Sequence, residues 1–211
     1  ANISAEFLNA NGEIIPEFKS IHHRHEVLYG AGDLELAFHI LAIRPTPKLP
    51  FRLEVNLGIT FPTGNTEPDP FQLGQEGKAH QHIFFGTGTF NPTLGMTLSY
   101  DFGRVVLVSW VQSKLYLYAN GHGYRGPTQA DIGLAAFIKF PKAKLQLRIG
   151  PELYTEEPAR WSGQDARNSG RSTISGALGI YWSPAPGLNT HLVARVPFYN
   201  RIVGGQLDLP L

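Results

Sequence analysis

The chain has 211 residues, a net charge of +1 and no cysteine, and charged residues make up 17% of it. The length suits one all-β domain and no composition shift marks a second, so we treat 1–211 as a single domain. The near-neutral charge and the lack of a Lys/Arg cluster argue against nucleic-acid binding, and the missing cysteine excludes disulfides, thiolate metal sites and cysteine nucleophiles. No apolar run approaches 18 residues, which excludes a membrane helix but not a membrane barrel with alternating strands.

Residues 1–20 are expected to form an N-terminal extension or an additional strand. The first predicted strands then span residues 21–29 and 33–43. Residues 51–61, FRLEVNLGITF, carry the clearest signal, because apolar side chains alternate with polar ones throughout. Strands of soluble proteins usually have about five or six residues, whereas eleven suit a tilted strand that crosses a bilayer.

The alternation recurs along the rest of the chain, and no segment carries a convincing helical period. Further strands are predicted at residues 95–102, 105–118, 131–140, 143–154, 173–182, 189–196 and 203–209, which gives ten in all. Residues 80–90 and the N-terminal segment could each hold one more.

The connections between these strands are of two kinds, which alternate along the chain. Short links are predicted at residues 44–50, 103–104, 141–142 and 183–188. Long polar links are predicted at 62–93, 119–130 and 155–172, with a shorter one at 197–202. Short turns at one end and long loops at the other are typical of outer-membrane barrels. We therefore expect an all-β fold, an antiparallel up-and-down transmembrane β-barrel of about 10–12 strands.

If the apolar face meets lipid, the polar face lines the interior of the barrel. The predicted pore-lining residues are Glu35, His39, Arg52, Glu54, Asn56, Lys114, Lys139, Lys144, Gln146, Arg148 and Arg195, joined by Asp101, Gln206 and Asp208. Burying such a set unpaired in a sandwich core would cost several kcal/mol per charge, whereas a hydrated interior holds it. Two interpretations stay open: the charges pair across the lumen and plug it, or they line a narrow pore.

Other kinds of site have weaker signals. The histidines His22, His23 and His25, and the pair His80 and His82, suggest a metal site, but no carboxylate or cysteine completes a recognisable ligand pattern. We expect surface or pore-rim histidines and no metal. The glycines of residues 62–64 and 86–88 are expected to serve turns rather than a phosphate cradle, because no lysine and no helix follow them. Without a nucleophile elbow or a paired-carboxylate motif, we expect no catalytic residue and no cofactor.

Three segments resemble a known family. Gly-Asp-Leu at residues 32–34, LGITFPTGNT at 57–66 and GTGTFNPTLGMTLSYDFG at 86–103 are similar to the putative outer-membrane channels associated with the phenol meta-degradation pathway. The resemblance covers about residues 30 to 209. It implies a barrel in the bacterial outer membrane that passes small, often poorly soluble molecules. Such barrels usually end on an aromatic residue, whereas this sequence ends at Leu211, so barrel size and closure are open.

The sequence therefore predicts a narrow outer-membrane pore for passive or facilitated passage of a small-molecule cargo, with membrane lipid as its surroundings. The start at Ala1, with no charged-then-apolar leader, is expected of a processed mature form. Two alternatives remain. One is a soluble β-sandwich that acts as a binding or self-assembling structural module, and the other is an outer-membrane enzyme.

Overall fold

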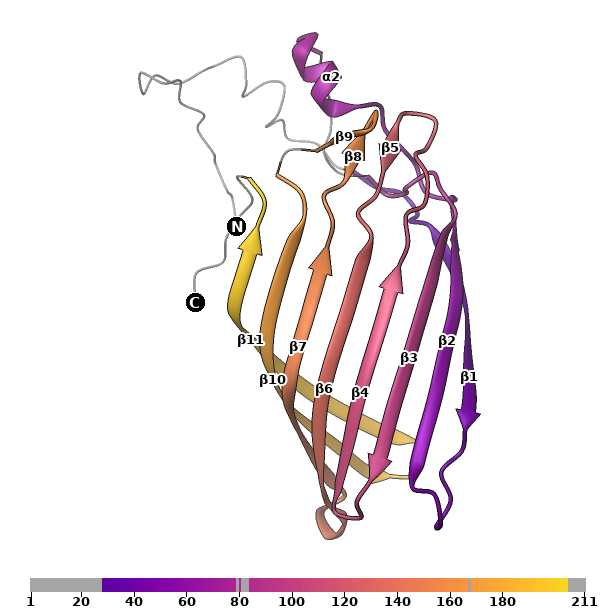
Figure 1. The fold of residues 1–211 in the computed structure, drawn as a ribbon, viewed down its shortest axis with the longest axis vertical. Helices are drawn as coiled ribbons and strands as arrows, with labels where there is room; N and C mark the ends of the chain where they lie inside the picture. Colours follow the sequence, from indigo (N-terminus) through magenta and orange to yellow (C-terminus); the bar gives the residue numbers. More distant parts are fainter. Residues whose placement is uncertain (1–27, 79, 81–83, 167, 205–211) are drawn as a thin grey trace.

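The computed structural model describes residues 28–78, 80, 84–166 and 168–204, which form two antiparallel sheets and one short helix. The strands of the large sheet are β1 (Leu34–Ile43), β2 (Phe51–Phe61), β3 (Asn91–Asp101), β4 (Val105–Lys114), β6 (Gln129–Phe140), β7 (Leu145–Glu156), β10 (Arg171–Ala185) and β11 (Leu188–Ile202). They follow one another in the sheet in chain order, each antiparallel to its neighbour (Figure 1). The predicted all-β, antiparallel up-and-down arrangement is thus confirmed.

The two kinds of connection lie at opposite ends of this sheet. The short turns after β1, β3, β6 and β10 lie at the lower end in Figure 1, and the long connections lie at the upper end. The upper end also carries a small sheet of three two-residue strands, β5 (Tyr124–Arg125), β8 (Arg160–Trp161) and β9 (Gln164–Asp165). The predicted separation of short from long connections is therefore present in the described residues.

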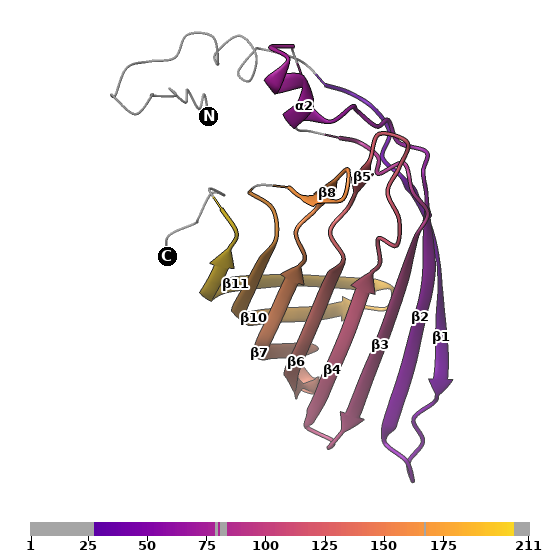
Figure 2. The same cartoon turned by 45° about the horizontal axis from the view of Figure 1, so that its top comes forward.

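The large sheet is strongly curled. In Figure 2, β10 and β11 turn behind the other strands and run nearly across them. Within the described residues β1 pairs only with β2, and β11 pairs only with β10, so both outer edges are open. Eight strands are described in this sheet where ten to twelve were predicted. The predicted first and last strands lie mainly in residues 21–27 and 205–211, outside the described residues.

Cross-strand register gives the sheet one continuous apolar face. Leu57 of β2 lies opposite Phe38 of β1 and Leu94 of β3. Ile149 of β7 lies opposite Ala136 and Leu178. Many of these side chains are exposed, with Phe38, Ile149 and Leu178 retaining 62%, 53% and 58% of their accessible surface. Because register keeps the period of two in step from strand to strand, the face is unbroken across the sheet.

The opposite face is concave and holds the most buried strand residues. Ala135 and Ala177 on this face are each 1% exposed. Gly133 of β6 leaves room there for Trp110 of β4, since a Cβ at Gly133 would lie 1.9 Å from the indole ring. Small residues on this face let the sheet curl around its large polar side chains.

Several predicted boundaries are wrong. The predicted link at 197–202 belongs to β11, which runs without a turn to Ile202. Pro197 is tolerated there because β11 is an edge strand of the described sheet, next to a bulge between Ile174 and Ser175 of β10. The strand predicted at 105–118 ends at Lys114, and the strand predicted from residue 95 begins at Asn91.

A short helix, α2 (Pro70–Gln75), lies in the long connection between β2 and β3, where no helix was expected. Its N-cap is Asp69, whose carboxylate accepts hydrogen bonds from the backbone N–H groups of Phe71 and Gln72. Proline at the first helical position has its φ already near the helical value. The Asp-Pro pair was the available sequence signal, but six residues are too few to show a helical period.

Candidate functional site: the concave polar face

The predicted pore-lining residues gather on the concave face. The structure places them there on six strands: Glu35 and His39 on β1, Arg52, Glu54 and Asn56 on β2, Lys114 on β4, Lys139 on β6, Gln146 and Arg148 on β7, and Arg195 on β11. The predicted Gln206 and Asp208 lie outside the described residues. Asp101 of β3 shares this face and accepts a hydrogen bond of 2.6 Å from Lys139. Arg52 and Glu54 pair with each other. Lining of a pore by these residues stays a prediction.

Lys144 departs from the predicted set, because it lies in a turn and not on a strand. It follows the 3-10 turn Pro141–Ala143 with φ of 53°, in the left-handed region. Its ammonium donates a 2.6 Å hydrogen bond to the carbonyl oxygen of Pro184. Lys144 thus ties the turn after β6 to the end of β10 at the lower end of the sheet.

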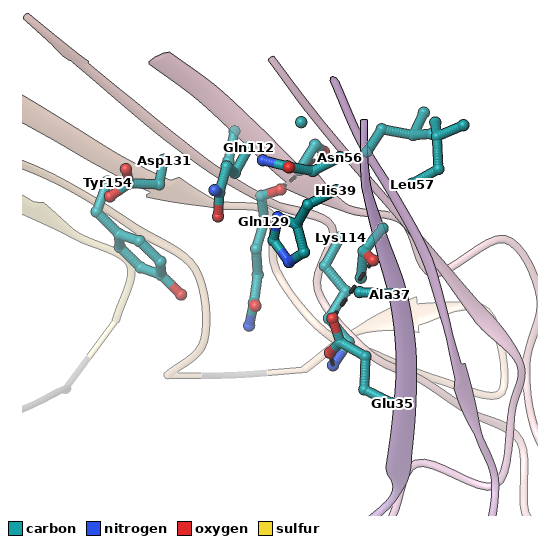
Figure 3. A pocket seen from close by; sticks show the side chains of 15 residues that line it. Glu35, Ala37, His39, Asn56, Leu57, Gln112, Lys114, Gln129, Asp131 and Tyr154 are labelled. Atoms are coloured by element: carbon teal, nitrogen blue, oxygen red, sulfur yellow. Dashed lines mark hydrogen bonds and ion pairs between the residues drawn. The ribbon is translucent and has the colours of Figure 1, made fainter. Parts of the chain in front are cut away.

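One half of the concave face encloses a cavity of about 300 Å³, shown in Figure 3. Glu35, His39, Asn56 and Lys114 line it, together with residues from β3, β6 and β7. Strands this far apart in the order border one cavity because the sheet curls around it. Glu35 lies 3.9 Å from the ammonium of Lys114, so the lining carries both signs of charge.

The other half holds a charged cluster around Glu152 of β7, beside a second cavity of about 300 Å³. One carboxylate oxygen accepts from Arg148 of the same strand, and the other accepts from Arg195 of β11 at 2.6 Å. The guanidinium of Arg148 also lies 5.1 Å from the centre of the Trp110 ring, and Trp110 donates to Asp131. Arg148 and Glu152 are 6% and 7% exposed, so the sheet buries the pair.

Glu152 is not among the residues predicted from the sequence, whereas Arg148 and Arg195 are. The signal was present, because residues four apart on a strand share a face and Glu152 follows Arg148 by four. Its link to Arg195 required the fold, since β11 approaches β7 only across β10. In this half of the face the charges pair along β7 and with β11, whereas pairing across a lumen stays a prediction.

Residues of the three family-like motifs meet at the upper end of the sheet, where β1, β2 and β3 meet the long connections. The carboxylate of Asp33 accepts hydrogen bonds from the backbone N–H of Gly64 at 3.0 Å and of Thr87 at 2.9 Å, and from the Thr87 hydroxyl at 2.7 Å. Partial burial raises the pKa of Asp33, but these three hydrogen bonds outweigh it and hold the pKa below its ordinary value of 3.8. Asn91, fully buried, donates to the hydroxyls of Thr60 and Thr87.

The motif glycines let two backbone segments touch. A Cβ on Gly86 would lie 2.4 Å from the carbonyl oxygen of Gly64, and a Cβ on Gly64 would lie 2.7 Å from the Cα of Gly86. Gly88 has φ of +69° and serves a turn, as predicted for that segment. The contact between Gly64 and Gly86 leaves no space for a phosphate between them.

Aromatic side chains from the long connections pack together beyond the upper end. Tyr124 and Trp161 have ring centres 4.8 Å apart, and Phe84 lies 5.7 Å from each. Tyr116 is buried against Gly126, and this burial raises its pKa to about 12. The long connections therefore form a packed cap rather than independent loops.

Of the predicted histidine clusters, His22, His23, His25 and His82 lie outside the described residues, and His80 is buried beside α2. No group of three or more metal-ligating side chains occurs in the part of the chain that the structure describes. In the same part, no helix is long and apolar enough to span a membrane.

No family model matches the chain, and comparison with curated proteins finds no match either. The resemblance to the outer-membrane channel family therefore stays a prediction, as do the expected absence of catalysis and of a cofactor. The fold defines the chain at a coarser level, as an all-β protein built on one curled antiparallel meander.

Proposed function

We propose that the chain forms the wall of a β-barrel channel in a bacterial outer membrane, through which small polar molecules pass. One observation carries the proposal: the curled sheet exposes apolar side chains on its convex face and gathers charged ones on its concave face, where Arg148 and Glu152 are buried. A soluble β protein has the opposite arrangement, because burying apolar surface drives its folding.

The strand dimensions support a membrane location. The strands of the large sheet have 10 to 15 residues, and about 9–11 residues suffice for a tilted strand to cross a bilayer. Unpaired backbone groups are costly in lipid, so the proposal requires that the open edges of β1 and β11 become paired. A closed barrel meets this requirement.

The alternative of a soluble β-sandwich explains the exposed apolar face less well. It needs a second sheet against the apolar face, whereas the described residues leave that face uncovered. Leu192, in the first third of β11, keeps 74% of its accessible surface. Exposed apolar surface on this scale, repeated on every strand of the large sheet, marks a surface that meets lipid or a partner.

The concave face suggests where cargo passes. The Glu152 cluster narrows one half to a cavity of about 300 Å³, and a cavity of similar volume lies between Glu35 and Lys114 in the other. A lining with both signs of charge favours small polar or zwitterionic molecules over large apolar ones. The passage is expected to be narrow, since about eight strands leave an interior that side chains nearly fill.

Swelling of vesicles that contain the purified protein tests this function, with uptake of a small amino acid as the readout. Gln112 lines the cavity on β4, and its neighbour Val111 lies on the convex face. Gln112→Trp is expected to reduce uptake several-fold by filling the cavity, and Val111→Trp is expected to leave uptake unchanged. Equal uptake by both variants, or none by the unaltered protein, would contradict the channel.

A further inference from the structure

The connections at the two ends of the sheet differ in the sign of their charged side chains. The turns at residues 44–50, 102–104, 141–144 and 186–187 contain five cationic side chains and no carboxylate. They are Arg44, Lys48, Arg104, Lys142 and Lys144. The described long connections at the other end mix acids such as Glu67, Asp69 and Glu157 with bases such as Lys78 and Arg160. The short-turn end is therefore strongly and uniformly positive.

Neighbouring carboxylates do not offset this charge. Asp101, beside the β3–β4 turn, already holds Lys139, and Glu54 already holds Arg52. Within the described residues Arg104 and Lys142 have no carboxylate at ion-pair distance. An uncompensated cluster of this kind attracts anions at its own end of the molecule.

Aromatic side chains accompany these cations, near the ends of the strands and in the turn after β3. Tyr100 and Phe102 have ring centres 4.5 Å apart and are 41% and 62% exposed, and Trp182 of β10 is 50% exposed. Apolar side chains favour the hydrocarbon of a membrane, aromatic rings favour its interface, and cations favour the lipid phosphates. The side chains at this end of the sheet follow the same order.

A cavity of about 570 Å³ lies between the β3–β4 and β6–β7 turns. Arg104, Lys142 and Phe140 line it, and the guanidinium of Arg104 lies 5.6 Å from the centre of the Phe140 ring. The backbone N–H of Lys139 donates to the carbonyl oxygen of Arg104 at 2.9 Å, which holds the two turns together. Lys139, which is paired with Asp101, also lines the cavity. The cavity thus combines three cations with an apolar wall on a fixed backbone.

We propose that this cavity at the short-turn end binds the headgroup of an anionic phospholipid, with Arg104 and Lys142 contacting its phosphate and Phe140 contacting the start of its acyl chains. The proposal rests on the membrane location proposed above and adds a lipid preference to it. Guanidinium and ammonium groups are the side chains that bind phosphate best, and the apolar wall distinguishes a lipid from a free anion.

Native mass spectrometry of the detergent-extracted full chain tests the site, by titration with phosphatidylglycerol and with phosphatidylcholine. Phosphatidylglycerol is expected to bind more tightly than phosphatidylcholine. The double variant Arg104→Gln and Lys142→Gln should weaken phosphatidylglycerol binding about tenfold, because each cation near a membrane surface contributes measurably to anionic lipid binding. The control is Lys78→Gln with Arg160→Gln, which removes the same charge at the opposite end and should leave binding unchanged.

Equal binding of both lipids, or equal weakening by the control, would overturn the lipid site. Displacement of phosphatidylglycerol by inorganic phosphate at equal concentration would overturn it too, and would assign the cavity to a free anion. Each of these results leaves membrane extraction and vesicle uptake intact, so they are distinguishable from failure of the channel itself. Recovery of the protein from the soluble fraction would overturn both proposals.

Discussion

At the scale of single residues, the concave face depends on the pairing of Glu152 with Arg148 and Arg195. Glu152→Gln leaves Arg148 buried with a weaker partner, and loss of one member of a buried pair typically costs about 3–5 kcal/mol. We expect a loss of that order in the free energy of unfolding, measured by urea titration of the folded protein in detergent.

Replacing Arg148 and Glu152 together distinguishes the cost of an unpaired buried charge from the cost of altered packing. Arg148→Met with Glu152→Leu removes both charges, and we expect it to recover most of the stability that Glu152→Gln loses. Glu157→Gln, in the long connection after β7, is the control and should change little. If Glu152→Gln is as stable as this control, the cluster is hydrated and its pairing does not stabilise the sheet.

Asp33 makes the upper end of the sheet sensitive to acid. Its pKa is lower in the folded protein than in the unfolded chain, so its stabilising contribution is complete above about pH 4 and is lost as pH falls through the folded pKa. Asp33→Asn is therefore expected to be less stable than the unaltered protein at pH 7. The difference should shrink towards pH 2, as measured by thermal unfolding across that range. A difference independent of pH would show that the hydrogen bonds to Thr87 do not depend on the charge.

At the scale of single strands, the two faces of β7 should respond in opposite ways to a new charge. Ile149 lies on the convex face and Gln146 on the concave face. Ile149→Arg is expected to cost about 2–4 kcal/mol near the middle of the bilayer, whereas Gln146→Arg is expected to cost little. Refolding into lipid vesicles followed by urea titration measures both. Equal tolerance would contradict the assignment of the convex face to lipid.

The elements also show which parts of the fold the sequence could predict. The strand at residues 51–61 was predicted with its observed bounds, because eleven residues alternate without a break. The end of β4 at Lys114 was missed because Leu115 and Leu117 continue the apolar alternation, although Tyr116 is buried against Gly126 in the cap. Likewise, Pro197 signals a turn in isolation, and the strand continues because Pro197 lies beside a bulge in the pairing of β11 with β10.

Part of the candidate site could likewise be predicted from the sequence, and part required the structure. The period of two was enough to place Arg52, Gln146 and Arg148 on one face, because face follows from local geometry alone. Which of these charges meet depends on the curl of the sheet, which no local pattern encodes. The contact of Arg195 with Glu152, two strands away, therefore required the structure.

At the scale of the whole molecule, the chain is a curled sheet with a charged interior, an apolar exterior and a packed cap of long connections at one end. The opposite end presents only cations in its turns. This arrangement gives the two ends different surroundings, with the short turns facing anionic headgroups in the proposed orientation. Both proposed roles of the molecule, as a channel and in lipid binding, require that the apolar convex face lies in a membrane.

Gel migration of the detergent-extracted full chain, with and without boiling, tests that claim most directly when the membrane and soluble fractions are run side by side. The account predicts a protein confined to the membrane fraction that migrates faster before boiling than after it, as a closed barrel does. A protein recovered from the soluble fraction, with the same migration in both samples, would contradict it.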